Sequence, residues 1–209
     1  VLVLTACERA GSPRSPSAVE GPKVPSADAL RAATAACKQV STGKYKLDAG
    51  ADDTVAICGL EGAVFWTADL DVDCDGVEST RCNKKADPDY QADTAAHDSQ
   101  GNPLNAAVLP YVVVPAPGDR WSYKQAGLRL GRSVVAVIHG DRVAFGVIGD
   151  VGPKAAIGEA SYAMAERLGM SPDPRRGGVA SGVTYIAFAG EQGVTRAEDA
   201  AEAERVGAA

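Results

Sequence analysis

The chain has 209 residues, and 45% of them are hydrophobic, which suits a single globular domain with a substantial core. It carries 27 acidic and 21 basic residues, for a formal net charge of −6. This balance argues against nucleic acids and anionic membrane surfaces as partners, because both select basic patches. A cationic ligand remains compatible with it.

The first 26 residues predict an export signal followed by a tether. Residues 1–7 are VLVLTAC, an apolar run in which small residues precede Cys7, as in the lipobox of bacterial lipoproteins. Residues 8–26 are rich in Ser, Pro and Gly, so we expect them to form a flexible tether. We therefore expect a protein that is secreted, or anchored to the outer face of the cell membrane by lipid on Cys7. A fortuitous apolar start is the alternative.

The folded part is expected over residues 27–190. Apolar residues at helical spacing predict a helix over 27–40, with Cys37 on its buried face. A second helix is predicted to begin near Gly158 and to stop at Gly169. Apolar runs bounded by turn residues predict strands over 54–57, 62–75, 111–115, 133–139, 142–150 and 181–190.

Two segments carry no strand pattern. Residues 76–105 form a long polar stretch, whose length indicates a functional or disulfide-pinned loop. Residues 191–209 are rich in Ala and Glu and are expected to form a solvated or frayed helix. Since most predicted elements are strands and the helices are short, the fold class is mainly β.

Five cysteines fit an exported protein. If Cys7 carries lipid, an even number remains, which favours disulfides in an oxidising compartment. Three pairings are possible, and proximity along the chain favours Cys37–Cys58 and Cys74–Cys82. A zinc site is the alternative, but no C-x2-C pair is present.

Alternating acids mark the segment TADLDVDCDG. In an extended strand, side chains two residues apart share a face, so we expect one row made of Asp69, Asp71, Asp73 and Asp75. Like charges this close raise one another's pKa, and a cation along the row would relieve them. Calcium is one candidate, but Cys82 stands where an EF-hand loop needs a bidentate Glu. A solvent-facing strand edge is another. We favour a groove for a positively charged ligand, without a metal.

Two further acids lie on predicted rigid elements. Asp150 ends an apolar strand and Glu159 stands at the predicted helix start. Two carboxylates held this way suit hydrolysis of a glycosidic bond, in which one protonates the leaving oxygen and the other activates water or attacks. The alternative is structural: Asp150 starts a turn, and Glu159 sits where a helix N-terminus favours negative charge.

Several blocks in one order resemble the chitosanases of glycoside hydrolase family 75, known from fungi and actinobacteria. The resemblance is carried by CGLEGAVFWTADLDVDCDG, RCNKKADPDYQ, LPYVVVP, SVVAVIHGDRVAFGVIGDVGPKAAIGEASYAMAERLGM and GGVASGVTYIAFAG. It implies endo-hydrolysis of β-1,4 linkages in chitosan with inversion, with Asp150 and Glu159 as the essential acids and no cofactor. It also implies that the acidic row contacts glucosamine ammonium groups. Separately, GDVGP followed by a short helix resembles the core of six-stranded double-psi β-barrels, as in the rare lipoprotein A family, and this resemblance implies that fold.

Which acid donates the proton stays open. The helix N-terminus favours an ionised Glu159 as base, and the apolar strand favours Asp150 as acid.

Trp66 and Trp121 are candidate sugar platforms or plain core, as are Tyr90 and Tyr123. A monomer is expected for an enzyme acting on a polymer. The alternatives are a non-catalytic carbohydrate-binding lipoprotein and a peptidoglycan-remodelling one.

Overall fold

The computed structural model describes residues 24–209. The expected lipobox with Cys7 and most of the tether over 8–26 therefore lie outside the described residues. In the described part, no helix combines the length and the apolar character needed to cross a membrane.

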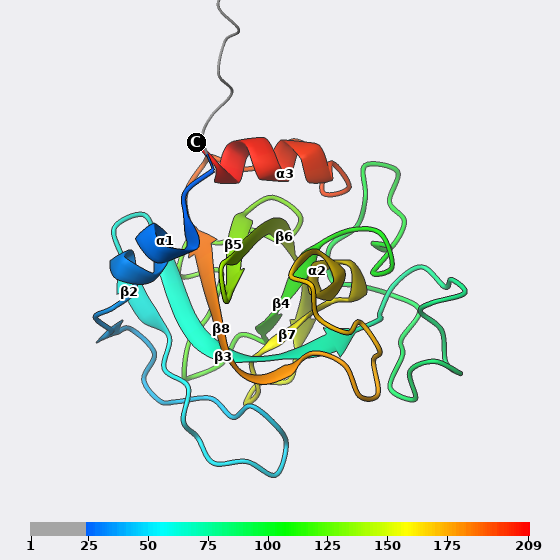
Figure 1. Ribbon diagram of the computed structural model, residues 1–209, viewed down its shortest axis with the longest axis horizontal. Coiled ribbons are helices and arrows are strands. Elements are labelled where there is room, and N and C mark those ends of the chain that lie inside the picture. Colours follow the sequence, from blue (N-terminus) through cyan, green and yellow to red (C-terminus); the bar gives the residue numbers. More distant parts are fainter. Residues whose placement is uncertain (1–23) are drawn as a thin grey trace, which may run out of the picture.

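Six strands close into a barrel, in the order β3-β7-β4-β6-β5-β8 and back to β3 (Figure 1). The pairs β3/β7 and β4/β6 are parallel, and the other barrel pairs are antiparallel. Their bounds are β3 Ala63–Asp73, β4 Tyr111–Pro115, β5 Val134–His139, β6 Arg142–Gly152, β7 Glu159–Ser161 and β8 Val179–Phe188. Two short strands, β1 (Lys38–Gln39) and β2 (Cys58–Leu60), extend the sheet beside β3. The prediction of a mainly β fold with a six-stranded barrel is confirmed.

The barrel interior is apolar, and residues two apart along each strand fill it. One buried cluster draws side chains from all six barrel strands, among them Leu70 and Val72 of β3 and Ile148 of β6. At its centre Trp66 stacks on Tyr185, with the ring centroids 5.2 Å apart. Offset stacking of two large aromatic rings adds to the hydrophobic stabilisation of this core.

A second apolar cluster covers part of the barrel's outside. Helix α3 (Ala200–Gly207) lies across β5 and β6, along the top of Figure 1. Gly207 is close to the ring of Phe145, where a Cβ would come within 2.2 Å of it. The C-terminal segment, expected to be a solvated or frayed helix, therefore ends in a helix packed on the barrel.

Two predicted helices are shorter than expected. Helix α1 covers Ala27–Ala33, and the chain then turns to pair with β2, because the Cys37–Cys58 disulfide holds the two segments together. Cys37 is consequently exposed and not on a buried helix face. The second helix, α2, covers Tyr162–Arg167 and follows β7 directly. Gly169 ends it with a φ of 71°, as predicted.

The remaining strands lie close to their predicted bounds, with one exception. In the segment 54–57 only Val55 pairs, in an isolated bridge with Tyr45, and β2 begins at Cys58. The pairings Cys37–Cys58 and Cys74–Cys82 are both present, with Cα atoms 5.1 and 4.9 Å apart. The predicted disulfides are confirmed.

Candidate active site

Three strands bring acidic residues into one row, with β4 lying between two of them. In the parallel pair β3/β7, Asp71 lies opposite Glu159. Val112 of β4 pairs with Ala160, so the next position of this antiparallel register sets Val113 beside Glu159. Val113 in turn lies opposite Asp150 of β6. Residues opposite each other on neighbouring strands point to the same face, so these side chains share the outer face of the barrel.

A β-bulge directs Asp150 to that face. The β4/β6 register steps from Val112–Ile148 to Val113–Asp150, which leaves Gly149 as the extra residue. Without the bulge, Asp150 would follow Ile148 into the apolar interior, since side chains alternate along a strand. Position 149 requires glycine because a Cβ would lie 2.5 Å from the Cβ of Tyr111. The sequence had indicated that Asp150 ends the strand. This is wrong, because β6 continues to Gly152.

The row opens on a cleft of about 500 Å³. Seven of its lining residues are acidic: Asp71, Asp73, Asp75, Asp87, Asp89, Asp150 and Glu159. The segment 174–177 forms one wall of the cleft. Arg175 connects this wall to the polar loop by donating hydrogen bonds to the carbonyls of Lys85 and Ala86, both at 2.8 Å. Asp87, Asp89 and Arg175 were not among the predicted site residues, although the long polar loop over 76–105 had marked part of this region.

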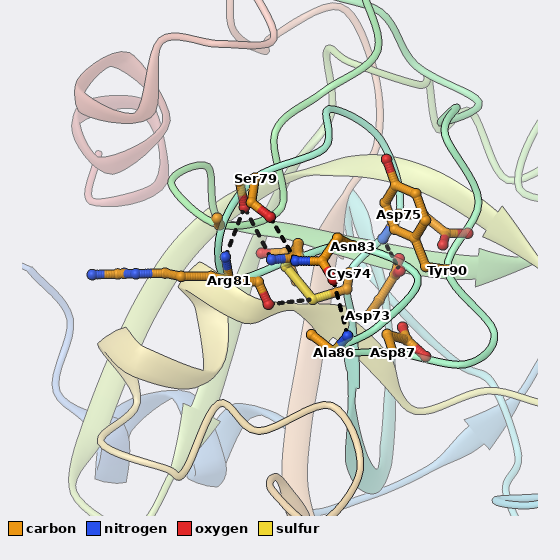
Figure 2. The surroundings of a disulfide bond; sticks show 12 residues. Asp73, Cys74, Asp75, Ser79, Arg81, Asn83, Ala86, Asp87 and Tyr90 are labelled. Atoms are coloured by element: carbon orange, nitrogen blue, oxygen red, sulfur yellow. Dashed lines mark hydrogen bonds between the residues drawn. A yellow bond between two sulfur atoms is a disulfide. The ribbon is translucent and has the colours of Figure 1, made fainter.

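The second disulfide fixes the loop that carries several of these acids. Cys74 lies between Asp73 and Asp75, and its bond to Cys82 closes a short loop beside them (Figure 2). Asp73 Oδ1 accepts the backbone N–H of Asp75 at 2.7 Å, and Asp75 Oδ1 accepts that of Gln91 at 2.6 Å. These bonds hold the residue that precedes the polar loop, and Gln91 in the middle of that loop, against the end of β3.

Glu159 is surrounded by other acids. Burial, followed by the charges of Asp71, Asp75 and Asp150, raises the pKa of its carboxyl group to about 7. Its Oε2 lies against Gly152, 2.9 Å from where a Cβ would be. The expectation that a helix N-terminus keeps Glu159 ionised is wrong, because Glu159 begins β7 and the cap of α2 is Ser161.

Asp150 has a different environment. Burial raises the pKa of its carboxyl group too, but Oδ1 accepts the backbone N–H groups of Ala95 at 2.8 Å and Val151 at 2.7 Å. Hydrogen bonds from two donors favour the ionised carboxylate and oppose the effect of burial. The environments of Glu159 and Asp150 thus affect their pKa values unequally.

Asp69 does not belong to the cleft. It is 4% exposed, and the backbone of Gly158 covers its carboxyl group, with Oδ1 only 1.9 Å from where a Cβ of Gly158 would lie. Burial, with the Asp71 charge second, raises its pKa to about 7. Of the four acids expected in one groove, Asp71, Asp73 and Asp75 line the cleft, whereas Asp69 does not, because the turn before β7 closes over it.

The predicted aromatic platforms lie elsewhere. Trp66 is fully buried in the barrel interior, and Trp121 lines a separate hollow beside Val40 and Arg120. Tyr90 donates its hydroxyl to the Gly76 carbonyl, and Tyr123 packs in the core. No aromatic side chain of residues 24–209 lines the acidic cleft. Within the same residues, no group of three or more His, Cys, Asp or Glu side chains is arranged to hold a metal ion.

Two carboxylates of unequal acidity in one cleft are the arrangement that glycoside hydrolases use. Residues 70–207 match the family described as "Fungal chitosanase of glycosyl hydrolase group 75". Because this match covers most of the chain, the protein belongs to that family, as its sequence blocks had indicated.

Named relatives agree with this membership. The chain is 34% identical over 139 residues to endo-chitosanase C of Aspergillus oryzae, covering 64% of this chain and 34% of that protein. It is 32% identical over 153 residues to endo-chitosanase B of the same species, covering 66% and 64%. An endo-chitosanase of Aspergillus fumigatus is 28% identical over 140 residues, covering 62% and 59%. The chain thus matches between about one third and two thirds of the length of these relatives.

Proposed function

We propose that the protein is an endo-acting glycoside hydrolase that cleaves β-1,4 linkages in chitosan with inversion of the anomeric carbon. The observation that carries this proposal is the row from Asp71 to Asp150, which brings Glu159 and Asp150 into one acidic cleft. Membership of the family and the names of the relatives support the same substrate.

The composition of the cleft suits a cationic polymer. Seven acidic side chains line it, against Arg175 and Arg176. A cleft lined mainly by one sign of charge raises the local concentration of ligands of the opposite sign. Chitosan carries ammonium groups along its length, whereas chitin is acetylated and uncharged. Since no aromatic side chain of the described residues lines the cleft, we propose that charge attracts the substrate here, with little help from ring stacking.

The environments of the two acids suggest their roles. Glu159, whose pKa is raised to about 7, retains a proton near neutral pH and would protonate the leaving oxygen. Asp150, with two backbone N–H donors on its carboxylate, would remain ionised and activate a water molecule. This reverses the assignment favoured by the sequence, which depended on a helix N-terminus at Glu159.

The strand order is compatible with inversion. Glu159 and Asp150 lie on β7 and β6, with β4 between them. Two strand spacings separate their backbones by about 10 Å. Inverting enzymes hold their carboxyl groups about 6.5–9.5 Å apart, which leaves room for a water molecule between the acid and the sugar.

Chitosan, chitin and peptidoglycan assayed side by side test the proposal. We expect the purified protein to release new reducing ends from soluble chitosan and far fewer from the other two polymers. Release from peptidoglycan instead would favour the peptidoglycan-remodelling alternative. Binding to chitosan without any release of reducing ends would favour the non-catalytic one. Either result would contradict the proposed function.

We also propose that the protein works outside the cell. Two disulfides within residues 24–209 fit an oxidising compartment. Attachment of lipid to Cys7 and the monomeric state stay predictions, which mass measurement of the membrane fraction and light scattering would check.

A further inference from the structure

The acidic cleft contains two positive side chains that differ in their freedom. Arg175 and Arg176 both line it. The guanidinium of Arg175 is engaged by the Lys85 and Ala86 carbonyls. The exposed side chain of Arg176 makes no hydrogen bond or ion pair with any residue of the range 24–209. Arg176 is thus available to a ligand in the cleft.

Backbone contacts hold Arg176 at the β3 end of the cleft. The turn that contains Arg176 is closed by hydrogen bonds from Gly177 N to the Asp173 carbonyl at 2.6 Å and from Gly178 N to the Ser171 carbonyl at 2.8 Å. Gly178 lies so close to β3 that a Cβ there would be 1.8 Å from the Leu70 carbonyl oxygen. Val179 then pairs with Leu70 of β3, so Arg176 lies three residues before the chain joins β3, at the β3 end of the cleft.

At the opposite end of the cleft, the charged lining residues in the described part of the chain are all acids. Beyond Asp150 the cleft continues into a smaller hollow of about 200 Å³, which shares Asp75, Gln91, Asp150 and Val151 with it and adds Asp93. No Lys or Arg of the described residues lines this hollow. The two ends of the cleft therefore differ in charge. Within residues 24–209, the β3 end has the unpaired Arg176 beside its acids, and the β6 end has acids as its charged lining residues.

This asymmetry distinguishes the two kinds of sugar in partly acetylated chitosan. A glucosamine unit carries an ammonium group, which a nearby guanidinium repels. An N-acetylglucosamine unit carries an uncharged amide, whose carbonyl oxygen accepts a hydrogen bond from the five-donor guanidinium. The β6 end has the reverse preference, since its carboxylates attract ammonium.

We propose that Arg176 makes the β3 end of the cleft a subsite for an N-acetylated unit, while the β6 end takes a unit with a free ammonium group. The acetylation pattern would then set both the direction and the position in which a chain binds. This inference rests on the proposed function and adds a residue that determines which linkages are cleaved.

Binding of defined oligosaccharides tests it. The probes are the glucosamine tetramer and the two tetramers with a single N-acetyl group at either end, measured by calorimetry in a Glu159→Gln background that prevents turnover. We expect one acetylated isomer to bind better than the plain tetramer when Arg176 is present. Arg176→Gln should remove this preference, and Arg176→Glu should shift it by about fivefold towards the plain tetramer, the scale of an exposed charge pair.

The matched control is Arg205→Gln, which makes the same change of charge on the exposed face of α3, away from the cleft. It should leave all three affinities unchanged. If the Arg176 variants bind the three tetramers in the same ratio as their parent, the subsite is disproved and the proposed function stands. If no tetramer binds and the unmodified protein releases no reducing ends from chitosan, the proposed function fails and the subsite fails with it.

Discussion

The two faces of β3 show how this barrel separates stability from chemistry. Leu70 and Val72 point into the apolar interior, whereas Asp71 and Asp73 point into the cleft. The interior face resembles any packed core, and its side chains stabilise the fold by leaving water. The cleft face has the opposite effect on stability, because its crowded carboxyl groups have raised pKa values. Substitutions on the two faces should therefore have different consequences.

The largest effect is expected on the cleft face. Glu159→Gln and Asp150→Asn should each lower kcat/KM on chitosan by roughly 10²–10⁴-fold, the usual contribution of a general acid or base. Neither should lower the melting temperature, because each removes a carboxyl group from a crowded acidic site. Glu61→Gln, on an exposed turn away from the cleft, is the control. Near-normal turnover in either cleft variant would overturn the site assignment.

Trp66→Ala should affect the interior face alone. The side chain is fully buried against Tyr185, so truncation should lower the free energy of unfolding by about 3–5 kcal/mol, as in other large-to-small core substitutions. Below its melting temperature the variant should keep its kcat on chitosan. Denaturant unfolding and initial rates measure the two quantities. A loss of activity at full stability would mean that Trp66 takes part in the chemistry after all.

Gly149→Ala should affect both faces, because the bulge there directs Asp150 outward. The added methyl group would meet the Tyr111 side chain, and such overpacking costs about 1–3 kcal/mol of stability. Unlike Trp66→Ala, it should also lower kcat in the folded protein by displacing Asp150.

Gly118→Ala is the control for this substitution. Its nearest contact would be the Ala116 carbonyl oxygen at 3.9 Å, so both stability and activity should be retained. Unchanged kcat in folded Gly149→Ala would show that the bulge does not position Asp150.

The smallest expected effect is on the pH dependence of stability. Glu159 has an ordinary pKa of 4.5 that is raised to about 7 in the fold, so the folded state binds its proton more tightly than the unfolded chain does. The contribution to stability is complete below pH 4.5 and is lost as the pH rises to about 7. Asp69 and Asp75, with pKa values of about 7 and about 6, act in the same direction.

Glu159→Gln should therefore reduce, but not abolish, the fall in melting temperature between pH 4.5 and 7. In the unmodified protein, activity should also decline above pH 7, as the proposed acid loses its proton. A melting profile that is identical with and without the Glu159 carboxyl group would contradict the raised pKa.

Local patterns in the sequence were sufficient for much of the fold. The apolar runs predict β4 and β5 almost to the residue. The alternation of the Asp segment predicts β3 and a row of four acids on one face, three of which line the cleft. Spacing along the chain also identified both disulfides. These features depend on neighbouring residues and on the period of two of a strand.

What the sequence missed depends on distant contacts. The burial of Asp69 requires the backbone of Gly158 to fold over it, and the short strand β7 exists only because β3 and β4 flank it. The bulge at Gly149 had a signal, a glycine inside an apolar strand, but its effect on Asp150 follows from the register with β4. Arg176 reaches the cleft through a turn whose position no local pattern predicts.

The anomeric form of the first product tests the central claim most directly. If Glu159 and Asp150 flank the sugar with a water molecule between them, hydrolysis of β-linked chitosan must give α-anomers first. Proton NMR during the first minutes of reaction, before the anomers equilibrate, distinguishes the two forms. We predict that the α-anomer signal rises first and that the β form follows by mutarotation. An initial excess of the β-anomer would mean retention through a covalent intermediate, and would contradict the assignment of an acid and a base on opposite sides of β4.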